Sequence, residues 1–225
     1  MNVRDTDAEH GASSSLLLET NSIGEAWILI ALHIMERGKP STYDGKKIAE
    51  LMMITLEIAS PKSHDAIIAQ FADPERLAWM HDNFNDHAIV SELGGADSYA
   101  TRLRDYEHAG RDQIAWVVER LRLDRHSRSA TITTLQPLSD TTYIPCVSLL
   151  DFFIEDDALA LSVYAHSIDF GAKGYANLTQ LAMLQEEVAM ALSLPLGRLV
   201  MIIKSAHVYQ SDDDYMKGVL TALSS

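Results

Sequence analysis

The sequence is short of cysteine, of positive charge and of long apolar runs, and each shortage excludes a class of protein. The single cysteine, Cys146, allows no disulfide within the 225 residues and fits a reducing cytoplasm. Lys and Arg number 18 against 32 Asp and Glu, a formal charge of −14, which argues against binding a nucleic-acid backbone. Neither the basic and apolar start of a signal peptide nor an apolar run as long as a membrane span is present in the sequence. We therefore expect a cytoplasmic protein with no nucleic-acid or membrane partner.

The composition indicates one folded domain behind a polar start. Hydrophobic residues make up 47% of the chain and charged residues 22%, which are ordinary values for a globular protein. The first stretch of the chain is polar and acidic and has no apolar pattern of its own. We predict that residues 1–20 are disordered and that residues 21–225 form a single domain.

Capping residues and helical periodicity predict several helices. Ser22 and Glu25 have the spacing of a capping box, and the apolar pattern that follows them stops at Gly38. Asp112 is suited to cap a second helix, whose apolar residues recur on one face as far as Leu121. Further helices are predicted over residues 74–84, over 178–192 and from about 211 onward.

Strand patterns are concentrated in the second half of the chain. β-branched or alternating apolar residues predict strands over 129–136, 147–154, 159–165 and 199–205, with a hairpin at 155–157. The apolar run 51–58 fits either a buried strand or a short helix, because so short a run has no period that decides between them. Helices followed by strands interleaved with helices predict a mixed α/β or α+β fold.

Four short groups of polar residues in the second half are not explained by strand packing. They are Pro145-Cys146, His166-Ser167-Ile168-Asp169, Asn177 at a helix start, and His207-Val208-Tyr209. In this order and spacing they resemble the thymidylate synthase and deoxycytidylate hydroxymethylase family. The pattern of that family runs Pro-Cys, Arg-Ser-x-Asp, Asn at a helix start, and His-x-Tyr.

The resemblance extends to a short branch of this family that is found mainly in archaea. That branch has a Ser-Ile-x-x-Ala-Trp helix, as residues 22–27 do here, and residues 99–106 and 112–114 are similar to its middle part. The match covers about residues 22–215, although residues 65–95 do not align. It implies a mixed sheet flanked by helices, residues 21–225 as the catalytic domain, and a homodimer packed sheet to sheet.

The resemblance implies that Cys146 is a nucleophile. C5 of a pyrimidine is too weak a nucleophile to attack a one-carbon donor, and a thiolate that adds to C6 makes C5 enolate-like. Hydride then gives a methyl product, or water gives a hydroxymethyl product. The implied donor is 5,10-methylenetetrahydrofolate or a related reduced pterin. Taken alone, a single cysteine is more often a buried apolar side chain.

The resemblance gives binding roles to the other motif residues. Asn177 matches the residue that reads the O4 and N3 edge of the pyrimidine, where an amide suits uracil, although asparagine also caps helices. His207 and Tyr209 match the pair that binds the ribose hydroxyls, and their spacing puts them on one side of a strand. Asp169 matches a carboxylate beside the pterin. Tyr99 matches a tyrosine in the network that removes the C5 proton, although as a lone tyrosine it equally fits the core.

The sequence departs from the family where phosphate is bound. Guanidinium groups grip phosphate bidentately there, and one of them keeps the cysteine ionised. That position is His166 here, next to the predicted substrate ligand Ser167, and a histidine is largely neutral near pH 7. Of the two arginines that the family sends across the dimer interface, only Arg128 is present. A further cation is expected at Lys46 or Lys47.

The sequence therefore predicts one-carbon transfer to C5 of a pyrimidine nucleotide or nucleoside. The altered phosphate site points away from ordinary deoxyuridylate and toward specialised metabolism. Two alternatives stay open: a non-catalytic pyrimidine-binding or regulatory homologue, and an enzyme that uses the thiol addition for another C5 reaction. No metal site is predicted, because His81 and His87, which lie near Asp82 and Asp86, do not share a helical face.

Overall fold

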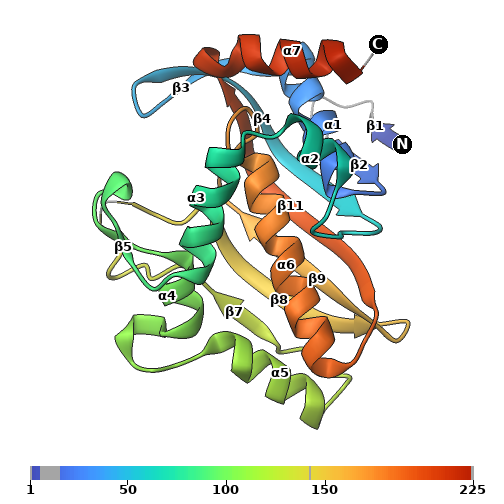
Figure 1. Cartoon of the computed structure of the whole chain (residues 1–225), viewed down its shortest axis with the longest axis vertical. Helices are drawn as coiled ribbons and strands as arrows, with labels where there is room; N and C mark the ends of the chain where they lie inside the picture. The colour runs from blue at the N-terminus through green and yellow to red at the C-terminus, as the bar shows by residue number, and fades with distance from the viewer. Residues whose placement is uncertain (1, 6–15, 142, 224–225) are drawn as a thin grey trace, which may run out of the picture.

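One large mixed β-sheet organises the chain, as predicted. The computed structural model describes residues 2–5, 16–141 and 143–223 (Figure 1). The sheet runs in the order β1 (Asn2–Asp5), β2 (Leu16–Thr20), β4 (Lys46–Ile58), β11 (Leu196–Tyr209), β9 (Ala158–Ala165), β8 (Val147–Glu155) and β7 (Thr131–Thr133). In addition, β3 (Lys39–Tyr43) pairs with β4, and β10 (Ile168–Asp169) pairs with β11. Neighbours are parallel in three pairs, β2 with β4 and β11 with β9 and β10, and the other pairs of this sheet are antiparallel.

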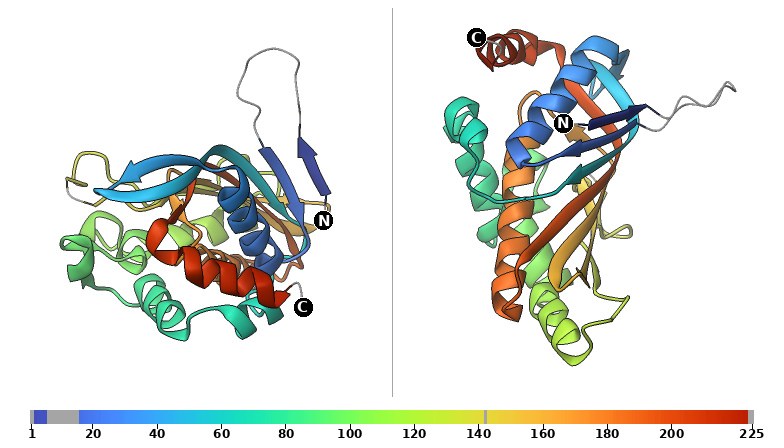
Figure 2. Two further views of the ribbon diagram at one scale, coloured as in Figure 1. Left: turned by 90° about the horizontal axis from the view of Figure 1, so that it is seen from above. Right: turned by 90° about the vertical axis from the view of Figure 1, so that its right-hand side faces the viewer.

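Helices cover one face of this sheet, and over the described residues the other face carries none (Figure 2). The helices are α1 (Ile23–Arg37), α2 (Ala66–Phe71), α3 (Pro74–Asn85), α4 (Tyr99–Arg104), α5 (Gln113–Leu123), α6 (Gly174–Leu192) and α7 (Asp213–Leu223). A two-stranded ribbon of β5 (Ile89–Val90) and β6 (Ala96–Asp97) lies between α3 and α4 in the chain. Among the described residues, none of the helices has both the length and the apolar character needed to cross a bilayer.

The predicted helices are present, and α6 and β11 are among the elements that are longer than predicted. Ser22 caps α1 by accepting a hydrogen bond from the Glu25 amide at 3.3 Å, and Asp112 caps α5 in the same way. α6 begins at Gly174 instead of residue 178, because its first turn is Gly-Tyr-Ala-Asn and shows no apolar period. β11 continues past residue 205 to Tyr209, because β10 and β4 both pair with its last residues.

Two strand predictions are resolved or corrected by the sheet. The ambiguous run 51–58 is strand, the second part of β4, and it pairs with β11. The strand predicted over 129–136 is limited to 131–133, because the chain turns away after it. In that turn the Asp140 carboxylate accepts a hydrogen bond from the Gln136 amide at 2.8 Å.

The prediction of disorder over residues 1–20 is wrong for the described parts of that segment. β2 pairs in parallel with β4, and Leu18 is fully buried in the core. β1 then pairs with β2 at the edge of the sheet. The apolar residues of β2 were too few to indicate a strand, and the partner that orders them lies far along the chain in β4. The other residues of the segment, 1 and 6–15, lie outside the described residues.

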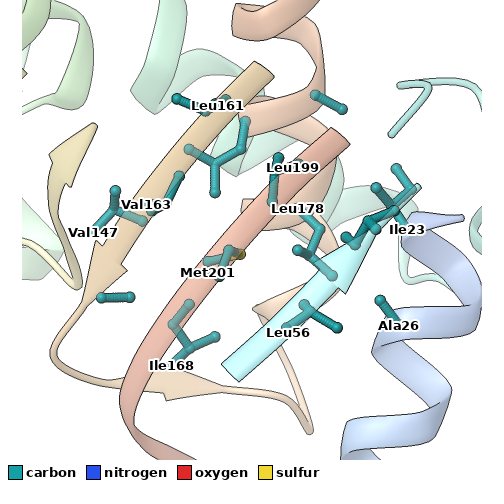
Figure 3. Packing of buried hydrophobic residues seen from close by; sticks show 14 of the residues in the cluster. Ile23, Ala26, Leu56, Val147, Leu161, Val163, Ile168, Leu178, Leu199 and Met201 are labelled. Carbon is teal, nitrogen blue, oxygen red and sulfur yellow. The ribbon is translucent and has the colours of Figure 1, made fainter. Parts of the chain in front are cut away.

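The core fills the space between the sheet and the helices (Figure 3). Its centre consists of apolar side chains from β4, β9, β11, α1 and α6, among them Leu56, Leu161, Val163, Leu199, Met201, Ala26 and Leu178. The apolar face predicted for α5 is also in the core, where Ile114, Val117 and Leu121 are buried. This packing holds the ends of β9, β10 and β11 close to the start of α6.

Trp27 connects the core to the segment that precedes α6. Its side chain is fully buried, and its indole Nε1 donates a hydrogen bond to the carbonyl of Phe170 at 2.9 Å. Its ring lies 4.6 Å from the ring of Tyr175, centroid to centroid. Trp27 therefore positions the backbone directly after Asp169.

We expect Trp27→Phe to lower the free energy of unfolding by about 2–3 kcal/mol, because it leaves a buried carbonyl without a donor and removes core volume. Urea unfolding followed by circular dichroism measures this change. Trp116→Phe is the matched control: Trp116 is 47% exposed, so the change should stay within about 0.5 kcal/mol. An equal loss in both variants would contradict the role given to Trp27.

Candidate functional site

A cleft of about 730 Å³ opens where β9, β10 and β11 end and α6 begins. Eight of the predicted site residues line it: Tyr99, Cys146, His166, Ser167, Asp169, Asn177, His207 and Tyr209. They come from the start of α4, the segment before β8, β10 with the two residues before it, the first turn of α6, and the end of β11. The fold thus brings together residues that are spread from position 99 to position 209 of the chain.

Cys146 lies directly before β8 and is half-buried. Its Sγ lies 3.6 Å from the hydroxyl of Tyr143. Burial raises the pKa of the thiol, while the hydrogen bond from Tyr143 and the positive charge of Lys173 act in the opposite direction. Tyr143 and Lys173 therefore increase the fraction of Cys146 that is ionised.

Tyr99 lies at the start of α4 and is buried beside Cys146. Its hydroxyl accepts a hydrogen bond from the Val147 amide at 3.0 Å, and its ring stacks on Phe84 with centroids 4.3 Å apart. Burial raises the pKa of Tyr99 far above its ordinary value. The phenol consequently keeps its proton and can donate a hydrogen bond next to Cys146.

His166 stands where the family has an arginine, and its environment keeps it neutral. Its amide donates to the Cys146 carbonyl at 3.0 Å, and its Nδ1 lies 3.1 Å from the hydroxyl of Ser148. Burial lowers the pKa of His166, and the positive charge of Lys204 lowers it further. Near pH 7 this side chain offers a neutral imidazole to the cleft, without the charge of a guanidinium.

His207 and Tyr209 both line the cleft from the end of β11, with ring centroids 5.1 Å apart. Nδ1 of His207 lies 3.4 Å from the hydroxyl of Ser167, and its buried Nε2 is without a hydrogen-bond partner among the described residues. Burial lowers the pKa of His207 to about 4, so this ring is also neutral. A buried polar atom without a partner is costly, and a ligand hydroxyl would supply the missing hydrogen bond.

Asn177 and Asp169 add an amide and a carboxyl to the same cleft. The Asn177 Nδ2 donates to the Lys173 carbonyl at 3.1 Å, which uses one of its two N–H bonds. The Asp169 Oδ1 accepts hydrogen bonds from the amides of Gly171 and Ala172 at 3.0 and 3.2 Å. Burial, together with the charge of Asp212, raises the pKa of Asp169 to about 6.

The remaining predicted residue, Arg128, lies apart from the cleft of its own chain. It is exposed in the connection between α5 and β7. Its predicted part in phosphate binding requires a second copy of the chain. Of the two lysines expected to supply a further cation, Lys46 lines the cleft, with its Nζ 5.6 Å from the ring centroid of Tyr209.

Several cleft residues were missed by the sequence analysis. Trp79, Met80 and Asn83 line the cleft from α3, in the segment that did not align. Tyr143 and Lys173 lie three and four residues before predicted site residues, and this proximity was the only signal in the sequence. The others include Tyr43, Asp44, Arg76, Glu92, Ser211 and Asp212.

The charges around the cleft do not favour an anion. Three cationic side chains line it, Lys46, Arg76 and Lys173, together with four carboxylates, Asp44, Glu92, Asp169 and Asp212. Arg76 is also paired with Asp212, with 3.5 Å between Nη2 and Oδ1. Among the residues described, no cluster of three potential metal ligands is present.

Asp169→Asn should change how stability depends on pH. The folded pKa of Asp169, about 6, is above its ordinary value of 3.8, so the folded protein holds a proton that the unfolded chain releases. Stability from this group is therefore present below pH 4 and is lost as the pH rises through 6. Relative to the wild type, the variant should gain about 2 kcal/mol in free energy of unfolding between about pH 4 and pH 8.

Urea unfolding of the wild type and the variant across this range measures the effect. Asp214→Asn, in the exposed first turn of α7, serves as the matched control. The same pH-dependent gain in both variants would show that Asp169 has no special environment.

The chain is similar to known proteins over most of its length. The thymidylate synthase family model matches residues 46–223. A protein of Methanococcoides burtonii named "Putative thymidylate synthase" is 31% identical over 219 residues, which cover 94% of this chain and 97% of that protein. A protein of the same name from Methanosarcina acetivorans is 31% identical over 216 residues, covering 92% and 96%. The bifunctional dihydrofolate reductase-thymidylate synthase of Leishmania major is 32% identical over 130 residues, 56% of this chain and 25% of that protein. The resemblance found in the sequence is thus confirmed, and the chain belongs to the thymidylate synthase family, as a divergent member similar to its short archaeal branch.

Proposed function

We propose that this protein transfers a one-carbon unit to C5 of a pyrimidine nucleotide or nucleoside, with Cys146 as the nucleophile. The observation that carries the proposal is the single cleft shared by Cys146, Tyr99, Asn177 and His207. In this proposal the thiol attacks the ring and the protonated phenol takes part in the proton transfer. The amide reads the base, and the unpartnered imidazole nitrogen binds a hydroxyl. The family to which the chain belongs supports the same chemistry.

In the proposed mechanism the Cys146 thiolate forms a bond to C6, and the electron pair of the C5–C6 double bond moves toward C5 and O4. C5 then forms its bond to the one-carbon unit, whose bond to the donor would break, and C5 loses its proton to water. Tyr99 donates a hydrogen bond at this stage and orients the group that accepts the proton, because its own raised pKa makes it a poor base. Release of Cys146 from C6 restores the ring.

The ring edge is read by Asn177 in this proposal. One of its N–H bonds is used by the Lys173 carbonyl, so one N–H and the amide oxygen remain for a ligand. A uracil ring presents O4 as an acceptor and N3–H as a donor, which matches this pair. We therefore favour uracil over cytosine as the base.

We propose that a reduced pterin binds in the same cleft, against Trp79 and Asp169. Trp79 offers a flat ring, with the Lys173 Nζ 5.3 Å from its centroid, and Asp169 offers a carboxyl oxygen in addition to the one bound by two amides. Trp79 and Asp169 would hold 5,10-methylenetetrahydrofolate or a related pterin there. When bound, this group would supply a carbon at the oxidation level of formaldehyde, and it would also be the source of the hydride that a methyl product requires, whereas a hydroxymethyl product would require only water.

The neutral His166 favours a substrate that relies little on a phosphate dianion. It is also the observation that favours the alternative function, a non-catalytic homologue that binds a pyrimidine.

We place the reaction in the cytoplasm and propose no nucleic-acid partner, because the net charge of −14 disfavours binding to a phosphate backbone.

The C5 hydrogen reports directly on the proposed chemistry. Proton NMR in heavy water should show loss of the C5 hydrogen from at least one of uridine, cytidine, their monophosphates or the deoxy forms. Cys146→Ala should abolish this loss, because no other group in the proposed mechanism adds to C6. Dependence on methylenetetrahydrofolate distinguishes transfer from simple exchange. Ligand binding without any loss of the C5 hydrogen would support the non-catalytic function instead.

Asn177→Asp should change the preferred base. A carboxylate repels O4 of uracil and accepts a hydrogen bond from the amino group of cytosine. We expect the ratio of kcat/KM for uracil to that for cytosine substrates to fall about 10- to 100-fold, since a mismatched buried polar group costs about 1–3 kcal/mol. An unchanged ratio would exclude Asn177 as the residue that reads the base.

We also propose that the open face of the sheet binds a second copy of the chain. Ile202, Tyr164 and Leu149 lie side by side on β11, β9 and β8 in the sheet register, and they are 41%, 36% and 39% exposed. Met52 and Met53 on β4 are also exposed. A continuous apolar row across a sheet face is typical of a protein interface. A dimer would also make Arg128 available to the partner.

Ile202→Glu should halve the mass in solution, because a charge in the middle of an apolar interface has no partner there. Size-exclusion chromatography with light scattering measures this. Met190→Glu is the matched control, since Met190 is 77% exposed on α6, away from the sheet face. A wild type that is already monomeric would contradict the proposed dimer.

A further inference from the structure

The groups that favour the thiolate of Cys146 are a phenol and an ammonium. The hydroxyl of Tyr143 lies 3.6 Å from Sγ, and the positive charge of Lys173 acts on the thiol through space. The negative charge of Asp169 acts against them. In the pattern of the family, the arginine that keeps the cysteine ionised stands at the position of His166. This chain has a histidine there, and its pKa is lowered.

The loop that carries Tyr143 is held at both ends. At its start, Asp140 forms an ion pair with Arg102 at 2.7 Å, and both side chains are almost fully buried. At its end, the Val147 amide donates to the hydroxyl of Tyr99. Arg102 and Tyr99 are both on α4, so one short helix anchors the loop on both sides of Tyr143. The position of the Tyr143 hydroxyl relative to Sγ follows from this anchoring.

In the pair of Tyr143 and Cys146, the phenol is the hydrogen-bond donor and the sulfur is the acceptor. Burial raises the pKa of Tyr143 far above its ordinary value, so the phenol keeps its proton near neutral pH. A phenol that stays protonated donates its hydrogen bond to sulfur, and donation to a charged acceptor favours the charged form. Removing the hydroxyl therefore has a defined direction: less thiolate at a given pH.

We propose that Tyr143 is a catalytic residue of this chain, which stabilises the Cys146 thiolate by donating its hydroxyl hydrogen bond to Sγ, with Lys173 as a second, through-space contributor. On ionisation the S–H proton leaves to water and the phenol keeps its own. Tyr143 and Lys173 together take the role of the arginine that the family has at the position of His166. The proposal rests on the proposed function for its role in turnover, whereas the thiol ionisation is tested without substrate.

The test is the pH profile of Cys146 alkylation by iodoacetamide in the full chain. Tyr143→Phe keeps the ring and removes the hydroxyl, and the midpoint of its profile should lie about one pH unit higher than in the wild type, which is about tenfold less thiolate near neutral pH. The ultraviolet absorbance of the thiolate in the unmodified protein gives the same midpoint by a second measurement. Melting temperature and circular dichroism confirm that the variant is folded.

Tyr106→Phe is the matched control, because the hydroxyl of Tyr106 donates to the Leu135 carbonyl at 3.3 Å, outside the loop that carries Tyr143, and Tyr106 is not among the residues that line the cleft. Its midpoint should equal that of the wild type. Lys173→Gln should give a smaller upward shift that is lost in about 1 M salt, where charges are screened, whereas the shift in Tyr143→Phe should persist.

A Tyr143→Phe midpoint equal to that of the wild type, or the same shift in Tyr106→Phe, would overturn the proposal. These outcomes are separate from those of the C5 experiment. A shifted midpoint without any loss of a C5 hydrogen would leave the role of Tyr143 in thiol ionisation and reject the transferase. Loss of a C5 hydrogen with an unshifted midpoint would support the transferase and reject the role of Tyr143 in thiol ionisation.

Discussion

The pairing of β11 with its neighbours is the constraint on which the rest of the structure depends. On one side it pairs antiparallel with β4, from Leu199 opposite Ile58 to Tyr209 opposite Ile48. On the other side it pairs in parallel with β9 and then with β10. Parallel neighbours end at the same edge of a sheet, so β9, β10 and β11 deliver their last residues to one place. The cleft lies at that edge, and α6 begins beside it.

Burial has a consistent effect on the chemistry of this cleft. It raises the pKa of Cys146 and of Asp169, and it lowers the pKa of His166 and of His207. Each of these shifts favours the neutral form of its side chain. A desolvated cleft of this kind suits an uncharged heterocycle and its hydroxyls better than a phosphate. The same desolvation makes thiolate formation difficult, which gives weight to each hydrogen bond and charge that faces Sγ.

Motif spacing indicated most of the site before the fold was known. Cys146 directly precedes a strand, Asn177 lies in the first turn of a helix, and His207 and Tyr209 lie at the end of a strand. Such positions can meet at the edge of a mixed sheet. The contribution of α3 could not be predicted in this way. Trp79 reaches the cleft only because α3 packs beside α6, and nothing local in the sequence indicates that contact. Lys173 was missed for a similar reason, since the first turn of α6 has no apolar period.

The sequence by itself determined the helix caps, most strands of the second half and the order of the motifs, and it predicted Cys146 as the nucleophile. These depend on residue type and on short spacing, which are local properties of the chain. Only the tertiary structure decided that β2 joins the sheet, that Tyr143 lies against Sγ, and that Arg128 is remote from the cleft of its own chain. The physical reason is that pairing with a distant strand, desolvation and the approach of two side chains are properties of the packed molecule. They arise when segments far apart in the sequence exclude water from one another.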